Sequence, residues 1–318
     1  MTLLIAAGLV ALLLAPHLLP QERLSPLTGA SVWLAALVLR AVLALLLALA
    51  IVLYLPATGI FQLITHWCFH AALPLLSGHL GFSGHQLGDA ATLVPTLILT
   101  FSALSAVFGI WRTARAVKRW LGHGSLGHGP ADSVIVGGKE IVIAAAGLRS
   151  PRVVVSVGAL TRFDDAELRA GLEHERGHIS RHHRFIALVA NLSLSLGRLL
   201  PGSRRAVTWL DFHLERDADA YALRRTNDPL ALASAICKAA RLRGHGPALA
   251  GLAGRGASER LRLLVSGSPS PSPFACLMAR AISVGLATLT VALVLSAPTL
   301  TQAVAGQPPT GTAHQCQR

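Results

Sequence analysis

The sequence predicts a mainly α-helical, multi-pass membrane protein with four transmembrane helices and one cytoplasmic α+β domain. The chain of 318 residues is 53% hydrophobic and only 14% charged, with a mean hydropathy of +0.56, which is too apolar for an ordinary soluble domain. The basic residues are also segregated, since no Lys or Arg lies between Arg40 and Arg112 and most lie in residues 112–275. Basic segments stay in the cytoplasm, so residues 112–275 are expected to form the cytoplasmic domain.

Four apolar runs each approach the length that a helix needs to cross the hydrocarbon core, about 20 residues. We expect transmembrane helices at residues 1–20, 31–55, 90–111 and 276–298. The basic residues directly after residue 111 orient the third helix from outside to inside. The loop 56–89, the tail 299–318 and both termini are then outside the cell membrane, and the lipid bilayer is an expected partner.

Three features of the apolar segments need a separate interpretation. Arg40 lies within the second run and is expected to snorkel to the lipid headgroups. Residues 60–80 are expected to be interfacial or re-entrant, because a further crossing would move the basic block outside. Residues 185–200 are too short to cross and contain Asn191, so they predict a buried or membrane-skimming helix of the central domain.

Within the central domain, the pattern predicts a small sheet followed by helices. Three β-branched runs are expected to form strands, at 134–136, 141–145 and 152–157. The pair Gly137-Gly138 predicts a hairpin between the first two, and the edge of the sheet can hold an extended peptide by strand addition. Asp164 and Glu167 indicate a capped helix start. Helices are expected at 165–183 and 204–225, and a Ser/Pro linker at 266–273.

Composition also argues against two other classes of protein. The net charge of +13 would suit a nucleic-acid partner, but no basic stripe is interleaved with aromatic residues, so we expect no direct nucleic-acid binding. The cysteines are scattered without a CxxC pair, which argues against a disulfide framework or a cysteine zinc knuckle; they are Cys68, Cys237, Cys276 and Cys316.

Residues 174–178 read His-Glu-Arg-Gly-His, which is the HExxH pattern. Positions four apart share one face of a helix, so His174 and His178 can bind one metal ion between them. Glu175 lies beside the first ligand and is the expected general base, which takes a proton from a zinc-bound water. The alternative is a surface helix with two solvated histidines. The chain has no GxSxG pattern for a serine nucleophile.

A catalytic zinc needs a third protein ligand and one open position. Glu215 and Asp219 lie four apart, hence on one helix face, in the sequence Glu-Arg-Asp-Ala-Asp. We predict that Glu215 completes a His₂Glu set for one Zn²⁺ per chain. Asp219 is expected to fix the tautomer of a ligand histidine. Asp217 is the reserve ligand. The alternative is an acidic helix face that pairs with neighbouring basic residues, Arg216, Arg224 and Arg225.

Other polar residues near the motif are given weaker roles. Arg181, His182 and His183 are expected to form a solvated helix end. No oxyanion donor can be identified, although His213 and Tyr221 lie near the third ligand in sequence. Gly177 within the motif costs about 1 kcal/mol of helix propensity, which a closely packed neighbour would explain.

These motifs resemble the BlaR/MecR-type membrane metallopeptidases, most closely over residues 152–221, through VVVSVGAL, DDAELRAGLEHERGH and LERDADAYA. The resemblance implies a cytoplasmic gluzincin-type zinc endopeptidase with His174, His178 and Glu215 as ligands. It also implies Glu175 as the base and Asp219 as the partner behind the ligands. Such proteins relay an outside signal by cleaving a transcriptional repressor, here expected to be of the winged-helix type, or by self-cleavage. Only residues 299–318 follow the last span, where the family has a penicillin-binding sensor domain, so beta-lactam sensing is not expected.

The sequence therefore predicts a membrane-anchored zinc endopeptidase that acts on a protein or peptide substrate at the cytoplasmic face. HtpX-type quality-control proteases and prenyl-protein endoproteases share the HExxH and ExxxD elements, so cleavage of damaged membrane proteins is an alternative. A non-catalytic membrane signalling protein with a retained metal site is another. Glu175 argues against the latter, because a structural zinc needs no adjacent base.

Overall fold

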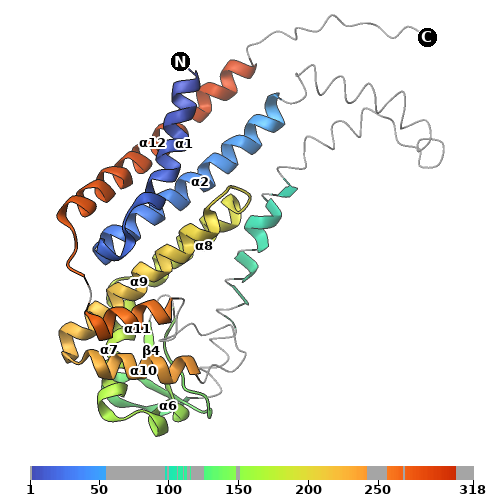
Figure 1. The fold of residues 1–318 in the computed structure, drawn as a ribbon. Helices are drawn as coiled ribbons and strands as arrows, with labels where there is room; N and C mark the ends of the chain where they lie inside the picture. Colours follow the sequence, from blue (N-terminus) through green and yellow to red (C-terminus); the bar gives the residue numbers. More distant parts are fainter. Residues whose placement is uncertain are drawn as a thin grey trace, which may run out of the picture.

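The computed structural model describes residues 2–54, 125–147, 151–241, 256–267 and 269–305, together with 97–98, 100–105, 107–109, 111–112 and 115. These residues form a mainly helical structure with one small sheet (Figure 1). The N-terminal helices are α1 (Thr2–Leu18) and α2 (Pro26–Tyr54), and the last helix is α12 (Pro273–Ala305). Between them lie β1 (Ser125–His128), β2 (Val134–Val136), β3 (Ile143–Ala146), β4 (Arg152–Ser156), α6 (Val157–Arg162), α7 (Asp165–Ser180), α8 (His183–Gly197), α9 (Ser203–Thr226), α10 (Pro229–Arg241) and α11 (Ala257–Ser266).

Helices α1, α2 and α12 lie side by side at one end of the molecule (Figure 1). Two of them are long and apolar enough to cross a membrane, over Pro26–Ala50 with hydropathy 2.6 and over Pro273–Ala297 with hydropathy 1.9. The described residues therefore contain two candidate spans, where the sequence predicted four. The predicted loop 56–89 and most of the tail 299–318 lie outside the described residues, and the predicted span 90–111 is described only in part.

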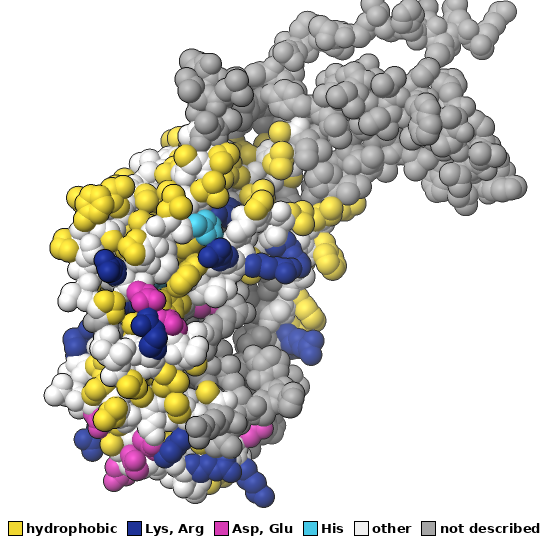
Figure 2. Space-filling model, viewed as in Figure 1, with side chains coloured by type: hydrophobic (Ala, Val, Ile, Leu, Met, Phe, Trp, Pro, Cys, Tyr) yellow, Lys and Arg dark blue, Asp and Glu magenta, His cyan; other side chains and the backbone are white. Residues whose placement is uncertain are grey.

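The surface of this end is rich in apolar side chains (Figure 2). On α12, Phe274 is 72% exposed and Leu295 is 71% exposed, although both are large hydrophobic residues. Large apolar patches on a soluble monomer are unusual, whereas lipid covers such side chains at no cost. The apolar surface and the two candidate spans together indicate association with a membrane.

Arg40 does not snorkel, contrary to the sequence prediction. Its side chain is buried, and its guanidinium donates to the backbone carbonyls of Ala36 at 3.0 Å, Leu13 at 3.1 Å and Pro201 at 3.3 Å. These carbonyls belong to α2, to α1 and to the turn between α8 and α9. Arg40 is therefore a buried connection between three elements, because polar partners are available within reach of its side chain.

The sheet has the strand order β1-β2-β4-β3, and the predicted hairpin is wrong. Strand β2 pairs with β4 in parallel, while β3 pairs with the other edge of β4 in the antiparallel sense. The connection after Gly137-Gly138 crosses the carboxyl end of β4, where the Ser156 hydroxyl donates to the Glu140 carbonyl at 2.6 Å. Gly158 permits this crossing, because a Cβ there would lie 2.4 Å from the Lys139 carbonyl oxygen. Strand β1 precedes the three strands that the sequence predicted and pairs with β2 in the antiparallel sense.

The helix that carries the HExxH motif begins as predicted. Asp164 accepts from the Glu167 backbone N–H at 2.8 Å, and Glu167 accepts from the Asp164 N–H at 3.0 Å, which is a complete capping box. The helix ends at Ser180 rather than near His183, because His182 takes a left-handed conformation with φ 54°. The chain therefore reverses, and α8 starts at His183.

Helix α8 corresponds to the apolar run at 185–200. One of its faces packs on α2 through Ile186, Ala190 and Leu194, while Phe185 on another face is exposed. The predicted linker at 266–273 is the segment between α11 and α12. The predicted helix at 204–225 is confirmed as α9.

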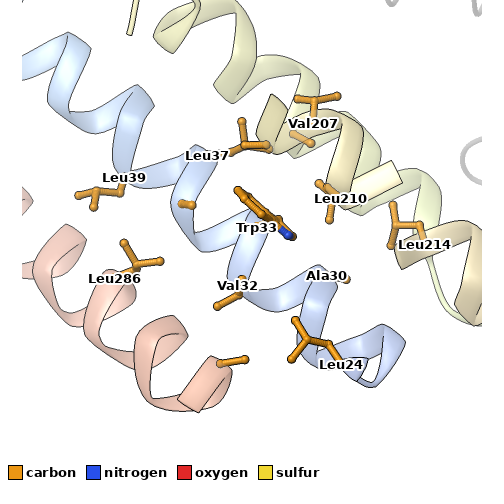
Figure 3. Close-up of a cluster of buried hydrophobic side chains, with 14 of the residues drawn as sticks. Leu24, Ala30, Val32, Trp33, Leu37, Leu39, Val207, Leu210, Leu214 and Leu286 are labelled. Atoms are coloured by element: carbon orange, nitrogen blue, oxygen red, sulfur yellow. The ribbon is translucent and has the colours of Figure 1, made fainter. Parts of the chain in front are cut away.

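Helix α9 joins the two main cores of the molecule. Trp33 of α2 is fully buried and points toward Val207 and Leu210 in the first half of α9 (Figure 3). Ala222, in the second half, belongs to a different core formed with α7, α10 and the sheet. The predicted ligand Glu215 lies between these halves, so one rigid helix connects the candidate membrane helices to the site.

Candidate metal centre

Helix α7 presents His174 and His178 on one face, as the spacing predicts. The two Nε2 atoms lie 3.2 Å apart, and His174 is fully buried. Helix α9 brings the Glu215 carboxylate to both rings, with 3.5 Å from His174 Nε2 to Oε2 and 3.5 Å from His178 Nε2 to Oε1. The donor atoms of these three residues lie within 4.8 Å of one another.

These separations suit a tetrahedral zinc site. With bonds of about 2.0–2.1 Å, neighbouring ligand atoms of a tetrahedral zinc lie about 3.3 Å apart. Two imidazoles and one carboxylate are also a donor set that leaves one coordination position for water. The residues present therefore fit a catalytic metal ion.

Asp219 lies behind the first histidine. Its Oδ1 is 2.9 Å from His174 Nδ1, the ring nitrogen that faces away from Glu215. Burial disfavours the charged imidazole, but the carboxylates of Asp219 and Glu215 beside the ring outweigh burial and raise the pKa of His174 to about 9. The sequence predicted this neighbour for a ligand histidine, and the structure brings the two side chains together.

The second histidine has a different environment. Burial lowers the pKa of His178 to about 3, so its ring is neutral in the metal-free protein. Its Nδ1 lies 3.0 Å from Nδ1 of His183, whose Nε2 lies 3.1 Å from Asp217 Oδ2. Asp217, the reserve ligand, is therefore not brought to the three ligand atoms. His183 is only 2% exposed, so its assignment to a solvated helix end is wrong, whereas Arg181 and His182 are exposed.

Glu175 is buried beside the ligands and faces β3. Its Oε2 accepts from the Ala145 backbone N–H at 2.7 Å, while its Oε1 is buried without a hydrogen-bond partner among the described residues. Burial raises the pKa of Glu175 to about 7. The Arg184 guanidinium donates to the carbonyl of the same Ala145. Both outward-facing backbone groups of Ala145 are thus bound by side chains of the site.

Arg260, from α11, is a member of the site that the sequence did not reveal. Its guanidinium donates to both Asp219 oxygens, at 2.8 and 2.6 Å, and to Glu215 at 2.5 Å, and it is 1% exposed. Burial opposes ionisation of Glu215, but the charge of Arg260 outweighs it and holds the pKa of that carboxyl below its usual value. Arg216, one of the partners in the alternative interpretation of the acidic helix face, donates to backbone carbonyls of Gln21, Glu22 and Leu24.

Gly177 explains how α7 and α9 approach closely enough to form the site. A Cβ at this position would lie 3.1 Å from both the Cα of Ala218 and the Cβ of Tyr221. Tyr221 therefore packs against the motif helix, and its ring lies under the Arg225 guanidinium at 5.0 Å. His213 faces α2, with Nε2 3.1 Å from Gln21 Oε1. Among the described residues, neither side chain hydrogen-bonds to the ligands, which gives no support to an oxyanion role.

Comparison with known proteins supports the chemistry of this site. Residues 129–212 match the profile of peptidase family M48. The matched segment runs from just before β2 through α7 and α8 into α9, so it includes His174, Glu175 and His178 and ends shortly before Glu215. No curated protein and no solved structure gives a significant match. The match supports family M48 and does not extend to the BlaR/MecR type. By this match and by the geometry of its site, the protein is similar to the metal-dependent peptidases of family M48.

Proposed function

We propose that the protein is a membrane-anchored, zinc-dependent endopeptidase that hydrolyses a peptide bond of a protein substrate at the cytoplasmic face. The observation that carries this proposal is the convergence of His174, His178 and Glu215 beside the buried carboxyl of Glu175. A structural zinc site would use four protein ligands with no open coordination position, and it would not need a neighbouring base.

His174, His178 and Glu215 would hold the metal ion. When bound, zinc supplies a Lewis acid that polarises the scissile carbonyl and lowers the pKa of water. Asp219 Oδ1 lies 2.9 Å from His174 Nδ1, which favours the proton on Nδ1 and so keeps Nε2 free as a donor toward the metal. Arg260 keeps both Glu215 and Asp219 ionised in the absence of solvent.

Glu175 performs the proton transfer. The Ala145 N–H fixes one carboxylate oxygen at 2.7 Å, which leaves Oε1 to accept a proton from the attacking water. A pKa of about 7 lets the same group hold that proton and then give it to the leaving amine. The peptide nitrogen departs as a neutral amine, so the carboxylate is restored after each turnover.

Strand β3 is the surface along which an extended substrate would lie. It is the last strand of the sheet order, and the N–H and carbonyl of Ala145 point to the site rather than to β4. An added peptide strand would pair through the Ala145 carbonyl, while the Ala145 N–H continues to hold Glu175. The incoming substrate would take the Ala145 carbonyl from Arg184, which is then free to contact the substrate backbone.

Two classes of protein substrate fit the proposed activity. The resemblance to BlaR/MecR proteins favours a winged-helix transcriptional repressor, cleaved in response to an outside signal. The quality-control alternative uses the same site on damaged membrane proteins. Cleavage of a repressor encoded next to this chain would favour the first, and cleavage of misfolded membrane proteins without such a partner would favour the second.

A metal-exchange experiment tests the proposed activity. The full chain, purified in detergent, is assayed for cleavage of an unfolded protein before and after treatment with a zinc chelator. We expect cleavage to disappear with the metal and to return when Zn²⁺ is added back. Cleavage that continues at full rate in metal-free protein would contradict the proposal.

A further inference from the structure

We propose that His183 and Asp217 form a hydrogen-bonded relay that positions the imidazole of His178 as a metal ligand. This inference rests on the proposed function, because it concerns the same metal centre. Neither residue is part of the HExxH motif or of the ligand set, and Asp217 was expected to be a reserve ligand. The relay makes both of them positioning residues.

The turn between α7 and α8 creates the contact. His182 is exposed, and its left-handed backbone with φ 54° directs His183 back over the last turn of α7. The His178 and His183 rings meet edge to face, with centroids 5.0 Å apart and an interplanar angle of 77°. The facing Nδ1 atoms are 3.0 Å apart, which is a hydrogen-bond distance.

Only one arrangement of protons satisfies the whole chain of contacts. A ligand histidine gives the lone pair of Nε2 to the metal, so His178 carries its proton on Nδ1. His183 Nδ1 must then accept that proton's hydrogen bond and cannot carry a proton itself. The proton of His183 therefore lies on Nε2, where it is donated to Asp217 Oδ2 at 3.1 Å. Neutral His183 is thus oriented by a carboxylate at one nitrogen and orients His178 with the other.

Each of the two ligand histidines is oriented by a different aspartate of α9. Asp219 contacts His174 directly, whereas Asp217 reaches His178 through His183. Residues two apart on a helix point to different sides, so one aspartate cannot serve both rings. Arg181 Nε lies 3.7 Å from Asp217 Oδ2 and is a second neighbour of this carboxylate. The relay therefore matches the rule that a ligand histidine donates its second N–H to an acceptor.

A purely structural role of His183 predicts a different effect of its replacement than the relay does. His183 is buried, and its bond to Asp217 connects the start of α8 to α9, so its removal lowers stability in either case. Only the relay also predicts weaker zinc binding by protein that is still folded, and rescue by a side chain that restores the acceptor.

The test measures zinc affinity of the full chain in detergent by competition with a chromophoric chelator, alongside thermal unfolding of the metal-free protein. We expect His183→Ala to lower the affinity roughly 10- to 100-fold, the usual effect of losing such a partner. His183→Gln can accept from His178 with its carbonyl and donate to Asp217 with its amide, so it should recover most of the affinity. Asp217→Ala should weaken binding as well, but less, because both imidazoles remain.

The matched control is His182→Asn, which changes the exposed neighbouring histidine to a residue that tolerates the left-handed backbone. It should bind zinc as the wild type does. Wild-type affinity in both His183→Ala and Asp217→Ala would overturn the relay. A wild-type protein that binds no zinc would instead overturn the proposed function. If His183→Ala does not fold, Asp217→Ala and His183→Gln decide the question: wild-type affinity in the former, or loss without rescue in the latter, overturns the relay.

Discussion

At the scale of single residues, the metal centre contains buried charges that stabilise one another. Glu215 and Asp219 are buried acids on one helix face, and Arg260 is the cation that both share. The bound metal would add a second positive charge beside Glu215. The centre is therefore expected to respond to loss of the arginine differently with and without zinc.

Replacement of Arg260 by alanine tests this balance. Breaking a buried ion pair from one side costs about 3–5 kcal/mol, because it leaves uncompensated charge in a low dielectric. We expect a large fall in the melting temperature of the metal-free protein and a smaller one with saturating zinc. The control is Arg262→Ala, which removes an exposed arginine on the same helix and should change little. Equal destabilisation with and without zinc would contradict the shared-charge account.

The sequence allowed part of this site to be predicted, for a clear physical reason. Ligands four apart on a helix share a face whatever the rest of the chain does, so His174 with His178, and Glu215 with Asp219, could be paired from spacing. Arg260 reaches the site from a later helix, and no local pattern encodes that distance. His183 was missed because its position depends on the left-handed turn at His182, which no local pattern predicts.

At the scale of elements, the contact between α7 and α9 sets the geometry of the centre. Each helix carries part of the ligand set, and Gly177 lies at their closest approach. The sequence showed the cost of this glycine in helix propensity, and the packing explains it. The hairpin prediction failed for a related reason, since Gly137-Gly138 permits a tight turn but cannot specify which edge of β4 the next strand joins.

A valine at position 177 tests the helix contact. Its side chain must push α9 away, because even a Cβ would lie 3.1 Å from the Ala218 backbone. Overpacking of this kind costs about 1–3 kcal/mol, and it should also weaken zinc binding by separating Glu215 from the histidines. Ala166→Val places the same side chain at an exposed position of α7 and should cost only helix propensity. Unchanged zinc affinity in Gly177→Val would show that the contact does not set the site.

The packing of α9 on α2 gives a pH prediction. Burial, reinforced by the charge of Arg216, lowers the pKa of His213 to about 3, well below the usual value for histidine. Its ring lies against Gly29, where a Cβ would approach to 2.3 Å. In the unfolded chain this histidine binds a proton near pH 6.5, while in the folded chain it stays neutral. Its contribution to stability is therefore lost progressively as the pH falls from about 6.5 toward 3.

Thermal unfolding of the wild type and of His213→Gln at several pH values measures this contribution. The wild type should lose more stability than the variant between neutral and acidic pH, because glutamine does not titrate. The control is His182→Asn, which removes an exposed histidine and should leave the pH dependence of thermal stability unchanged. Parallel curves for the wild type and His213→Gln would contradict the assignment.

At the scale of the whole molecule, α9 connects the candidate membrane helices to the candidate metal centre. Its first half packs on α2 within the core around Trp33, and its middle carries Glu215. Hydropathy predicted candidate spans in α2 and α12, because apolar length is a local property of the sequence. Hydropathy did not predict that Arg40 is buried against the α8–α9 turn, since this depends on tertiary packing.

The topology is a prediction from the distribution of basic residues. A reporter fused after residue 120 should indicate the cytoplasm, and one fused after residue 70 should indicate the outside, because basic segments remain inside. A fusion after residue 241, at the end of α10, serves as a second cytoplasmic point. The opposite pattern would place the metal centre outside and overturn the proposed cytoplasmic substrate.

In the proposed mechanism, three residues hold the metal ion and a fourth, Glu175, transfers the proton. Glu175→Gln tests this division of roles directly. The measurement is zinc content and cleavage of an unfolded protein by the purified wild type and variant. Glutamine has the shape of glutamate but cannot accept the proton, so we expect one zinc per chain in both proteins and a loss of cleavage of about 10²- to 10⁴-fold in the variant. Undiminished cleavage by Glu175→Gln, with zinc still bound, would contradict the central claim.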